Sequence, residues 1–276
     1  MVELLASAAA GVSIRSLRGT PGLQAADRLL RRVWNIQPGE DPPMALDVMC
    51  ALAHTGGYIG GAYLGDRLAG VSAGWLAAGG TLHSHVAGVA PEAQGRGVGN
   101  LLKAHQREWA AERGLTAISW TFDPLVRRNA YFNLVKLRAF AVDYLPDFYG
   151  PMSDGINDGD VSDRLLVRWP VVPASGGVSG GASGGASGGV SGGDELLAGS
   201  EVIVDEAGAV LSAGNAPLLR CATPADVEGL RRDDPAAARR WRAALGTALS
   251  GALTGGYRIT GFTRSGWYLL ARGDVS

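Results

Sequence analysis

Apolar residues recur at helical spacing in four segments of the first 140 residues. In residues 21–35, Leu23, Ala26 and Leu30 fall on one helical face, and Pro21 stands where a helix can begin without losing a hydrogen bond. The same spacing predicts further helices over residues 42–57, 98–114 and 127–139. In the third of these four helices the expected apolar stripe is Leu101, Leu102, His105 and Trp109.

Shorter apolar runs between these helices predict the strands of a sheet. Residues 58–77 contain two such runs on either side of Gly65-Asp66, which is typical of a β-hairpin. Further strands are expected over residues 12–17, 81–91, 115–122 and 163–169. Because strands and helices alternate, we expect an α/β or α+β fold around a single sheet.

A run of glycine and serine interrupts the pattern late in the chain. Residues 174–193 read ASGGVSGGASGGASGGVSGG, a composition that cannot bury a core and is typical of a flexible tether. We therefore predict a main domain over residues 1–170, a linker over 171–197 and a small α+β extension over 198–276.

The predicted C-terminal extension has helix and strand signals of its own. Thr223 to Asp226 reads as a capping box with Thr223 as the N-cap, and a second helix should begin near Asp234. Residues 257–262 and 267–272 are expected to pair as a hairpin. A core of this size gives only marginal stability to an isolated domain. We therefore expect the extension to dock on the main domain or, in a homodimer, on a second copy of the chain.

Composition and charge narrow the functional classes. The net charge of −1 argues against nucleic acid or an anionic membrane as a partner, and no apolar run reaches the length of a membrane span. The N-terminal segment lacks the basic residues of a signal peptide, and Cys50 and Cys221 fit free thiols in a reducing, cytoplasmic setting. No residues show metal-ligand spacing, so we expect no metal.

The most informative segment is VAGVAPEAQGRGVGN, residues 86–100, in which an apolar run is followed by glycines and then by a helix. It lacks the Gly-Lys-Ser/Thr of a P-loop and the G-x-G-x-x-G spacing of a dinucleotide-binding loop. What remains is Q-x-x-G-x-G, formed by Gln94, Gly97 and Gly99. The backbone N–H groups from Arg96 to Gly99 would point at one anion at a helix N-terminus, and the Arg96 side chain could add a contact.

This strand-loop-helix unit resembles the acyl-CoA-binding motif of the GNAT superfamily of N-acetyltransferases. The resemblance covers about residues 12–170 and implies the GNAT fold, whose mixed central sheet splays apart at the acyl-CoA site. The strands carrying residues 83–89 and 117–122 should therefore splay beside Gly97. The residues implied or expected to bind the cofactor are Val89, Gln94, Gly95, Arg96, Gly97, Val98, Gly99 and Asn129.

Two further segments, WTFDPLVRRNAYFNLVKLRAF and DFYGPMSDGINDGDVSDRLLVRW, are similar to a branch of GNAT proteins that includes enzymes acting on amino acids. Some members of that branch are associated with N-acylation of amino acids, with succinyl-CoA among the donors. The resemblance thus implies an acyltransferase that uses acetyl-CoA or another acyl-CoA. It would transfer an acetyl or succinyl group to the amine of a small molecule.

The implied reaction is attack of a neutral amine on a thioester, which needs a base for the ammonium proton and donors for the developing oxyanion. By resemblance, the backbone around residues 86–89 is the donor. His83 and His85 are two residues apart on one strand and should share a face with Ala87, and His85 is a candidate base. Asp123, at the C-terminal end of the next strand, is the other candidate.

The acid for the leaving thiolate is less evident from the sequence. Many GNAT proteins carry a tyrosine in the helix after the fifth strand, and alignment places Leu134 at that position. Tyr149, in the segment DFYG, is our replacement candidate, with Tyr131 behind it. Water could also protonate the thiolate if no side chain does.

Two other functions fit the same residues. A non-catalytic, CoA-binding regulatory module would account for the missing tyrosine, and a protein N-acetyltransferase would need an acceptor groove open enough for a peptide. The residues that could bind a substrate carboxylate are Arg127, Arg128 and Arg164.

Overall fold

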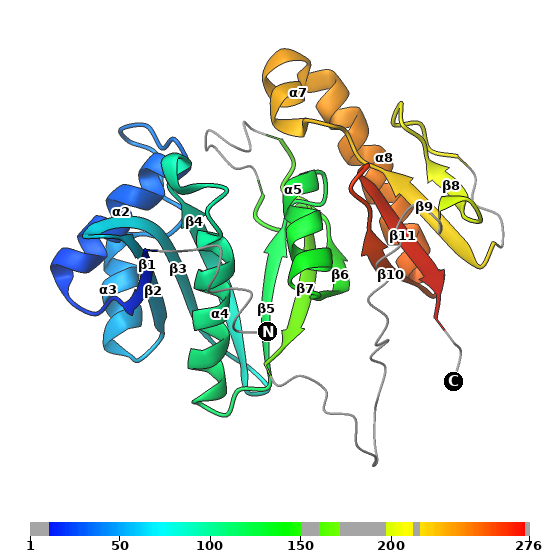
Figure 1. Cartoon of the computed structure of the whole chain (residues 1–276). Coiled ribbons are helices and arrows are strands. Elements are labelled where there is room, and N and C mark those ends of the chain that lie inside the picture. The colour runs from blue at the N-terminus through cyan, green and yellow to red at the C-terminus, as the bar shows by residue number, and fades with distance from the viewer. Residues whose placement is uncertain (1–10, 151–159, 172–196, 212–215, 274–276) are drawn as a thin grey trace, which may run out of the picture. The chain divides into compact units, whose positions relative to one another are not determined.

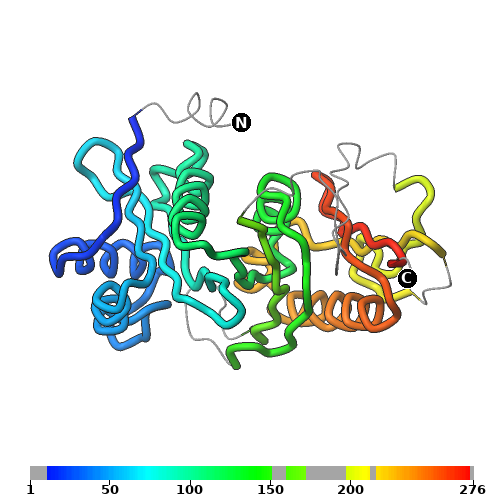
Figure 2. The backbone as a smooth tube through the Cα atoms, turned by 90° about the horizontal axis from the view of Figure 1, so that it is seen from below, coloured from blue at the N-terminus to red at the C-terminus, as the bar shows by residue number. Residues whose placement is uncertain are grey.

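The computed structural model describes residues 11–150, 160–171, 197–211 and 216–273. The chain divides into two compact units (Figures 1 and 2), and each is described by itself. Of the described residues, unit 1 comprises 11–120 and 170–171, and unit 2 comprises 121–150, 160–169, 197–211 and 216–273. The predicted linker lies almost wholly outside the described residues, so the predicted domain boundaries stay a prediction.

Unit 1 is a mixed sheet with helices on both faces. Its strands are β1 (Val12–Ser16), β2 (Tyr58–Leu64), β3 (Arg67–Ala77), β4 (Thr81–Val89) and the first part of β5 (Ala117–Phe122). Consecutive strands pair antiparallel from β1 to β4, whereas β4 and β5 pair parallel. Its helices are α2 (Thr20–Val33), α3 (Leu46–His54), the short η1 (Pro91–Ala93) and α4 (Val98–Ala111). The predicted α/β fold with a mixed sheet is confirmed.

Glycines at two sheet positions show which helix covers which face. A Cβ on Gly70 would lie 2.9 Å from a methyl of Val98, so this position faces α4. A Cβ on Gly88 would lie 2.7 Å from the Trp34 ring, at the end of α2. Gly88 pairs with Val71, the neighbour of Gly70, and adjacent strand residues point to opposite faces. Helices α2 and α4 therefore cover opposite faces of the sheet, each in close contact with its backbone.

Unit 2 contains the helical segment that follows β5 and a second sheet. Its helices are α5 (Arg127–Ala130), the π-helix η2 (Tyr131–Lys136), α7 (Val227–Asp233) and α8 (Pro235–Thr254). Strands β6 (Phe140–Leu145) and β7 (Arg164–Pro170) pair antiparallel. The second sheet has the strand order β10-β11-β9-β8, with β8 (Glu201–Val204), β9 (Leu218–Ala222), β10 (Tyr257–Phe262) and β11 (Trp267–Arg272).

Several elements of unit 2 differ from the prediction. The helix expected over residues 127–139 is the short α5 followed by a π-helix that ends at Lys136. Strands β6, β8 and β9 were not predicted. The N-cap of α7 is Asp226, whose carboxylate accepts from the Gly229 N–H at 2.9 Å, and not Thr223. Thr223 instead donates its hydroxyl to the Gly266 carbonyl at 2.7 Å, which joins β9 to the β10–β11 hairpin.

Other predicted features of the C-terminal part are confirmed. Helix α8 starts at Pro235 behind Asp234, which accepts from the Ala237 N–H at 2.9 Å. The hairpin predicted over residues 257–262 and 267–272 is formed by β10 and β11. Among the described residues, none of the helices combines the length and the apolar character that a membrane span requires.

Candidate functional site

Strand β4 separates from β5 after a short parallel ladder. The ladder joins Thr81 to Ala117, Leu82 to Ile118 and His83 to Ser119, and in the described strands it extends no further. Strand β4 itself continues for six more residues, to Val89, and stays paired with β3 on its other side. The end of β4 therefore has one open edge, as the GNAT resemblance predicted.

The backbone of β4 presents polar groups along this open edge. The N–H of Ala90 bonds to the Ala69 carbonyl at 2.9 Å, on the β3 side. Neighbouring residues of a strand point their N–H groups to opposite edges, so Val89 and Ala87 direct theirs away from β3. An extended chain with amide groups can pair with such an edge as an added strand would.

The loop between β4 and α4 has the geometry of an anion site. Gly95 and Gly97 both have φ of 77°, in the left-handed region that glycine adopts most readily, and Gly97 is the N-cap of α4. A Cβ at either glycine would meet nothing within 4 Å, so the space beside the loop is open. The first helical bond joins the Leu101 N–H to the Gly97 carbonyl at 3.1 Å. The N–H groups before it have no intrahelical acceptor and are available to an anion.

The side chains of this loop suit the same role. Gln94 and Arg96 are exposed, whereas Val98 is buried and fixes the first turn of α4 against the sheet. The loop thus presents one cation and several N–H groups around an open space. Among the described residues, no group of three or more His, Cys, Asp or Glu side chains could hold a metal ion.

Behind this loop, α4 buries a chain of polar side chains that the predicted stripe did not include. Lys103 Nζ donates to Ser84 Oγ at 2.9 Å and to Gln106 Oε1 at 3.1 Å, and it lies 3.8 Å from the centre of the Trp120 ring. Gln106 in turn donates to Ser72 Oγ at 3.3 Å. Lys103 and Gln106 are buried, whereas Leu101 and His105 of the predicted stripe are only half-buried. The real stripe is therefore shifted toward Leu102, Lys103, Gln106 and Trp109.

We expect Lys103 to make stability depend on pH. Burial lowers the pKa of the folded Lys103 to about 7, whereas an unfolded lysine titrates near about 10.4. Between these values the unfolded chain binds more protons, so the free energy of unfolding should rise with pH across that window. Lys103→Met should flatten the rise in denaturation curves recorded at several pH values. Lys136, the chain's other lysine, is exposed, and an equal effect of Lys136→Met would contradict this explanation.

A β-bulge in β4 changes the predicted arrangement of the histidines. Pairing with β3 shifts between Ala73 and Gly74, so His85 is an extra residue between the paired Ser84 and Val86. His83 and His85 both lie against the Trp75 ring, with centroids 5.4 and 4.7 Å away. Ala87 pairs with Ser72, which bonds to α4 on the other face. The prediction that Ala87 shares their face is wrong, because the bulge reverses the alternation.

The surroundings of His85 define which of its nitrogens carries the proton. Nε2 lies 3.0 Å from the Pro43 carbonyl, which can only accept, so the neutral ring carries its hydrogen there. Nδ1 is then an unprotonated lone pair, and it has no hydrogen-bond partner among the described residues. Burial lowers the pKa of His85 and outweighs the opposing effect of the Pro43 bond. His85 is thus a neutral imidazole at pH 7, with its basic nitrogen unused.

The structure gives Asp123 a different environment from that of a general base. Arg242 donates to its two carboxylate oxygens at 2.7 and 2.8 Å, and Arg231 donates to one of them as well. The same two arginines also bind Asp160, at 2.9 Å from Arg242 and 3.2 Å from Arg231. All four side chains are buried. We call Asp123, Asp160, Arg231 and Arg242 the ion cluster.

The ion cluster keeps Asp123 charged and unable to take up a proton near neutral pH. Burial alone would raise the pKa of Asp123, but the hydrogen bonds and charge of Arg242, with Arg231, hold it well below its usual range. A carboxylate with so low a pKa and two guanidinium partners is a weak base. Its role in this structure is to anchor α7 and α8 to the end of β5.

Of the candidate acids, Tyr149 lies in unit 2 near the end of β5. It is 40% exposed, and its hydroxyl lies 3.2 Å from Thr121 Oγ1. The Arg164 guanidinium lies over its ring, 5.3 Å from the centroid. Tyr131 is engaged elsewhere, as the acceptor of a bond from Arg264 at 3.1 Å. Tyr149 therefore stays the candidate acid, because its hydroxyl is exposed and has Thr121 as a neighbour that can orient it.

Comparison with known families identifies the class of domain. Residues 5–131 match a family model described as an acetyltransferase (GNAT) domain. This segment contains the open edge of β4, the glycine loop, α4 and α5. Residues 5–131 therefore match the GNAT acetyltransferase family, as the sequence motif predicted. No curated protein matches the chain.

Solved structures similar to this chain include the following three acetyltransferases. The ribosomal-protein-S18-alanine N-acetyltransferase of Escherichia coli is 17% identical over 61% of this chain and 99% of its own, with a TM-score of 0.47. A putative acetyltransferase of Salmonella typhimurium, solved with its cofactor acetyl-CoA, is 13% identical over 61% and 98%, with a TM-score of 0.49. An aminoglycoside 6'-acetyltransferase type Ii is 16% identical over 59% and 99%, with a TM-score of 0.46. Their names cover protein and small-molecule acceptors and assign no acceptor to this chain.

Proposed function

We propose that the protein is an acyl-CoA-dependent N-acyltransferase that transfers an acetyl or succinyl group to the amine of a small molecule, such as an amino acid. The observation that carries the proposal is the juxtaposition of two features in unit 1. The N-terminus of α4 is capped by Gly97 in the left-handed conformation, and β4 stops pairing with β5 after His83. Together they offer an anion site and an open strand edge on consecutive stretches of chain.

The residues on these two features fit the parts of an acyl-CoA. The N–H groups at the start of α4, with Arg96, would hold the pyrophosphate, since a helix N-terminus and a guanidinium both favour negative charge. The outward N–H and carbonyl groups of Val89 would pair with the amides of the pantetheine arm. Gly95 and Gly97 leave room for this approach because they have no side chain. Asn129, half-buried in α5, is proposed as a further contact to that arm.

The bound acyl-CoA would supply an activated acyl group as a thioester. We propose that His85 accepts the proton of the attacking amine at Nδ1 through one water, because that nitrogen is buried and carries an unused lone pair. Backbone N–H groups of β4 near residues 86–89 would stabilise the negative charge that develops on the carbonyl oxygen. Tyr149 is proposed to protonate the departing thiolate. Asp123 is not part of this proposal, because the ion cluster occupies it.

The proposal is tested by thiol release from acetyl-CoA and from succinyl-CoA, each offered with pooled amino acids of both hands. We expect thiol release that depends on an added amino acid with at least one of the two donors. Comparison of the two release rates then shows which acyl group the enzyme prefers. CoA binding without turnover on any small amine, but with turnover on a peptide, would replace the small-molecule acceptor by a protein. CoA binding with turnover on neither would favour a regulatory module.

The role of His85 is tested by the pH dependence of kcat/KM. Because burial lowers its pKa, His85 stays neutral below the ordinary value of about 6.5, so the acid limb of the profile should lie below that pH. His85→Gln should reduce kcat by about 100-fold or more and remove the limb. His83→Gln is the matched comparison, because it alters the neighbouring ring against Trp75. If the limb disappears in His83→Gln and persists in His85→Gln, His83 is the base instead.

A further inference from the structure

A cavity in unit 2 concentrates positive charge. It has a volume of about 380 Å³ and is lined by residues of α5, η2, the end of β10 and the β10–β11 turn. Its cations are Arg127, Arg128, Lys136 and Arg264, and no carboxylate lines it. The whole chain has a net charge of −1, so this concentration does not follow from a basic composition. Cations around a concave surface focus the field and attract anions.

Arg127 is fixed in place by contacts with Thr223 and Gly266. Its Nε donates to Thr223 Oγ1 at 3.0 Å, and its Nη2 donates to the Thr223 carbonyl. A Cβ on Gly266 would come within 2.2 Å of Arg127 Nε, so the guanidinium packs directly on that glycine. Nη1 has no hydrogen-bond partner within the described part of the chain. A guanidinium held this way loses little entropy when its free nitrogen binds a ligand.

Tyr131 and the remaining cations complete the set of donors. Arg264 Nε donates to Tyr131 Oη at 3.1 Å, which leaves the hydroxyl hydrogen of Tyr131 to be donated elsewhere. Lys136 is exposed and has no ion-pair partner among the described residues. Arg128 is different, because Glu228 binds it through both oxygens and neutralises it. Arg127, Lys136 and Arg264 form no ion pair among the described residues, although Arg127 feels the charge of Glu206, and two sides of the cavity supply these cations.

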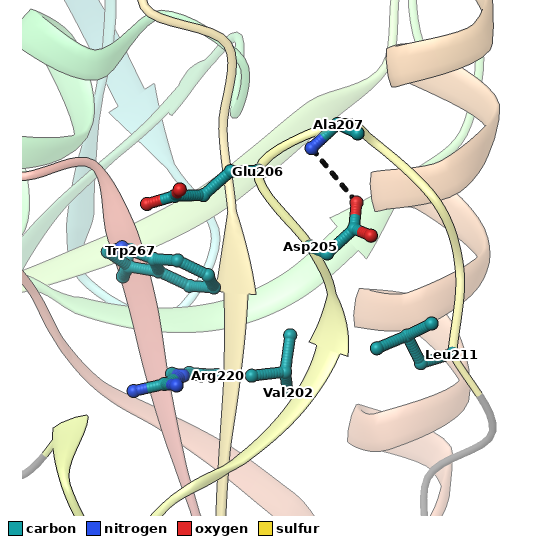
Figure 3. A pocket seen from close by; sticks show the side chains of 7 residues that line it. All are labelled: Val202, Asp205, Glu206, Ala207, Leu211, Arg220 and Trp267. Carbon is teal, nitrogen blue, oxygen red and sulfur yellow. Dashed lines mark hydrogen bonds between the residues drawn. The ribbon is translucent and has the colours of Figure 1, made fainter.

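A second cavity in the same unit shows the contrast. It has a volume of about 490 Å³ beside β8, β9 and β11, and it includes Asp205, Glu206 and only one cation, Arg220 (Figure 3). Asp205 accepts from the N–H groups of Ala207 and Ala209 at 2.9 and 2.8 Å, so its charge serves the local turn. Acidic groups in the lining make this second cavity unsuitable for an anion. Of these two cavities, the first is therefore the one expected to bind anions.

We propose that the cavity around Tyr131 binds the phosphate group of a small organic phosphate. Arg127 and Lys136 stand on the helical side and Arg264 stands on the hairpin side, so charged donors approach from more than one direction. Donors in such an arrangement match a tetrahedral dianion better than a single planar carboxylate. The Tyr131 ring and Phe262 provide an apolar wall for the attached organic part.

The test is calorimetric titration of the full chain at low ionic strength with inorganic phosphate, AMP and succinate. Phosphate and AMP should bind, with AMP at least as tight, and succinate should bind about tenfold more weakly. Arg264→Gln and Lys136→Gln should each raise the Kd for phosphate and for AMP by about tenfold. Arg239→Gln, an exposed site on α8 outside the cavity, makes the same charge change and should leave the Kd values unaltered.

Each contrary result overturns a defined part of the proposal. Absence of phosphate and AMP binding at millimolar concentration, in protein shown to be folded by circular dichroism, overturns the site. If Arg239→Gln weakens phosphate and AMP binding as much as the cavity variants do, the effect comes from the overall charge of the protein and not from the cavity. AMP binding that neither cavity variant alters places AMP elsewhere in the chain. Succinate binding as tight as that of AMP overturns the assignment to phosphate. The test measures binding and not thiol release. Its outcome is therefore independent of the proposed acyl transfer.

Discussion

Replacing Gly97 with glutamate should weaken CoA binding by about 100-fold or more and abolish thiol release. Gly97 has φ of 77°, a conformation that costs other residues about 1–2 kcal/mol, so the loop would shift away from its present geometry. The new carboxylate would also stand at the N-terminus of α4, where it would occupy and repel the site of the pyrophosphate. Binding is measured by calorimetry with CoA, which requires no acceptor.

Gly65 provides a matched control for this substitution. It also has a positive φ, of 60°, and open space where a Cβ would stand, but it lies in the β2–β3 turn. Gly65→Glu therefore introduces the same charge and comparable backbone strain in the same unit, away from the α4 loop. CoA binding should survive in Gly65→Glu. Equal loss in both variants would attribute the effect to instability of unit 1, and unchanged binding in Gly97→Glu would remove the loop from the CoA site.

The anion loop could be predicted from the sequence because its determinants are local. Left-handed backbone at Gly95 and Gly97 and the start of a helix at Val98 follow from a few adjacent residues. The face on which the histidines lie could not be predicted, since a bulge depends on how β4 registers with β3. A bulge leaves no mark in the alternation of HSHVAG, so His83, His85 and Ala87 looked equivalent.

The buried polar groups escaped prediction for a different reason. Lys103 follows an apolar pair in a helix that reads as amphipathic, and its acceptor Ser84 is 19 residues away on a strand. The partners of Asp123 are more distant still, at separations of 108 and 119 residues. From the sequence, Asp123 was interpreted as a candidate base at the end of a strand. Only the tertiary contacts show that two arginines of α7 and α8 bind it.

Removing one arginine of the ion cluster should destabilise unit 2 strongly. Arg242→Met would leave Asp123 and Asp160 buried with Arg231 as their only remaining cluster cation, so two carboxylates would share one guanidinium. Removing one partner of a buried ion pair lowers the free energy of unfolding by about 3–5 kcal/mol, because the remaining charge is buried without compensation. Arg239→Met, at an exposed position of the same helix, should change the free energy of unfolding by less than about 0.5 kcal/mol.

Hydrogen exchange can separate this effect from any change in unit 1. Amides of α7, α8 and β11 should lose protection in Arg242→Met, whereas those of β2 and β3 should keep theirs. Lowering the pH should cause the same loss of amide protection in the unsubstituted protein. Since the cluster holds the folded pKa of Asp123 below its unfolded value near about 3.9, its stabilisation is present above that pH and declines as the pH falls further. Unchanged exchange in Arg242→Met would mean that the Coulomb attraction in the cluster does no more than offset its desolvation, and that packing around α8 holds unit 2 together.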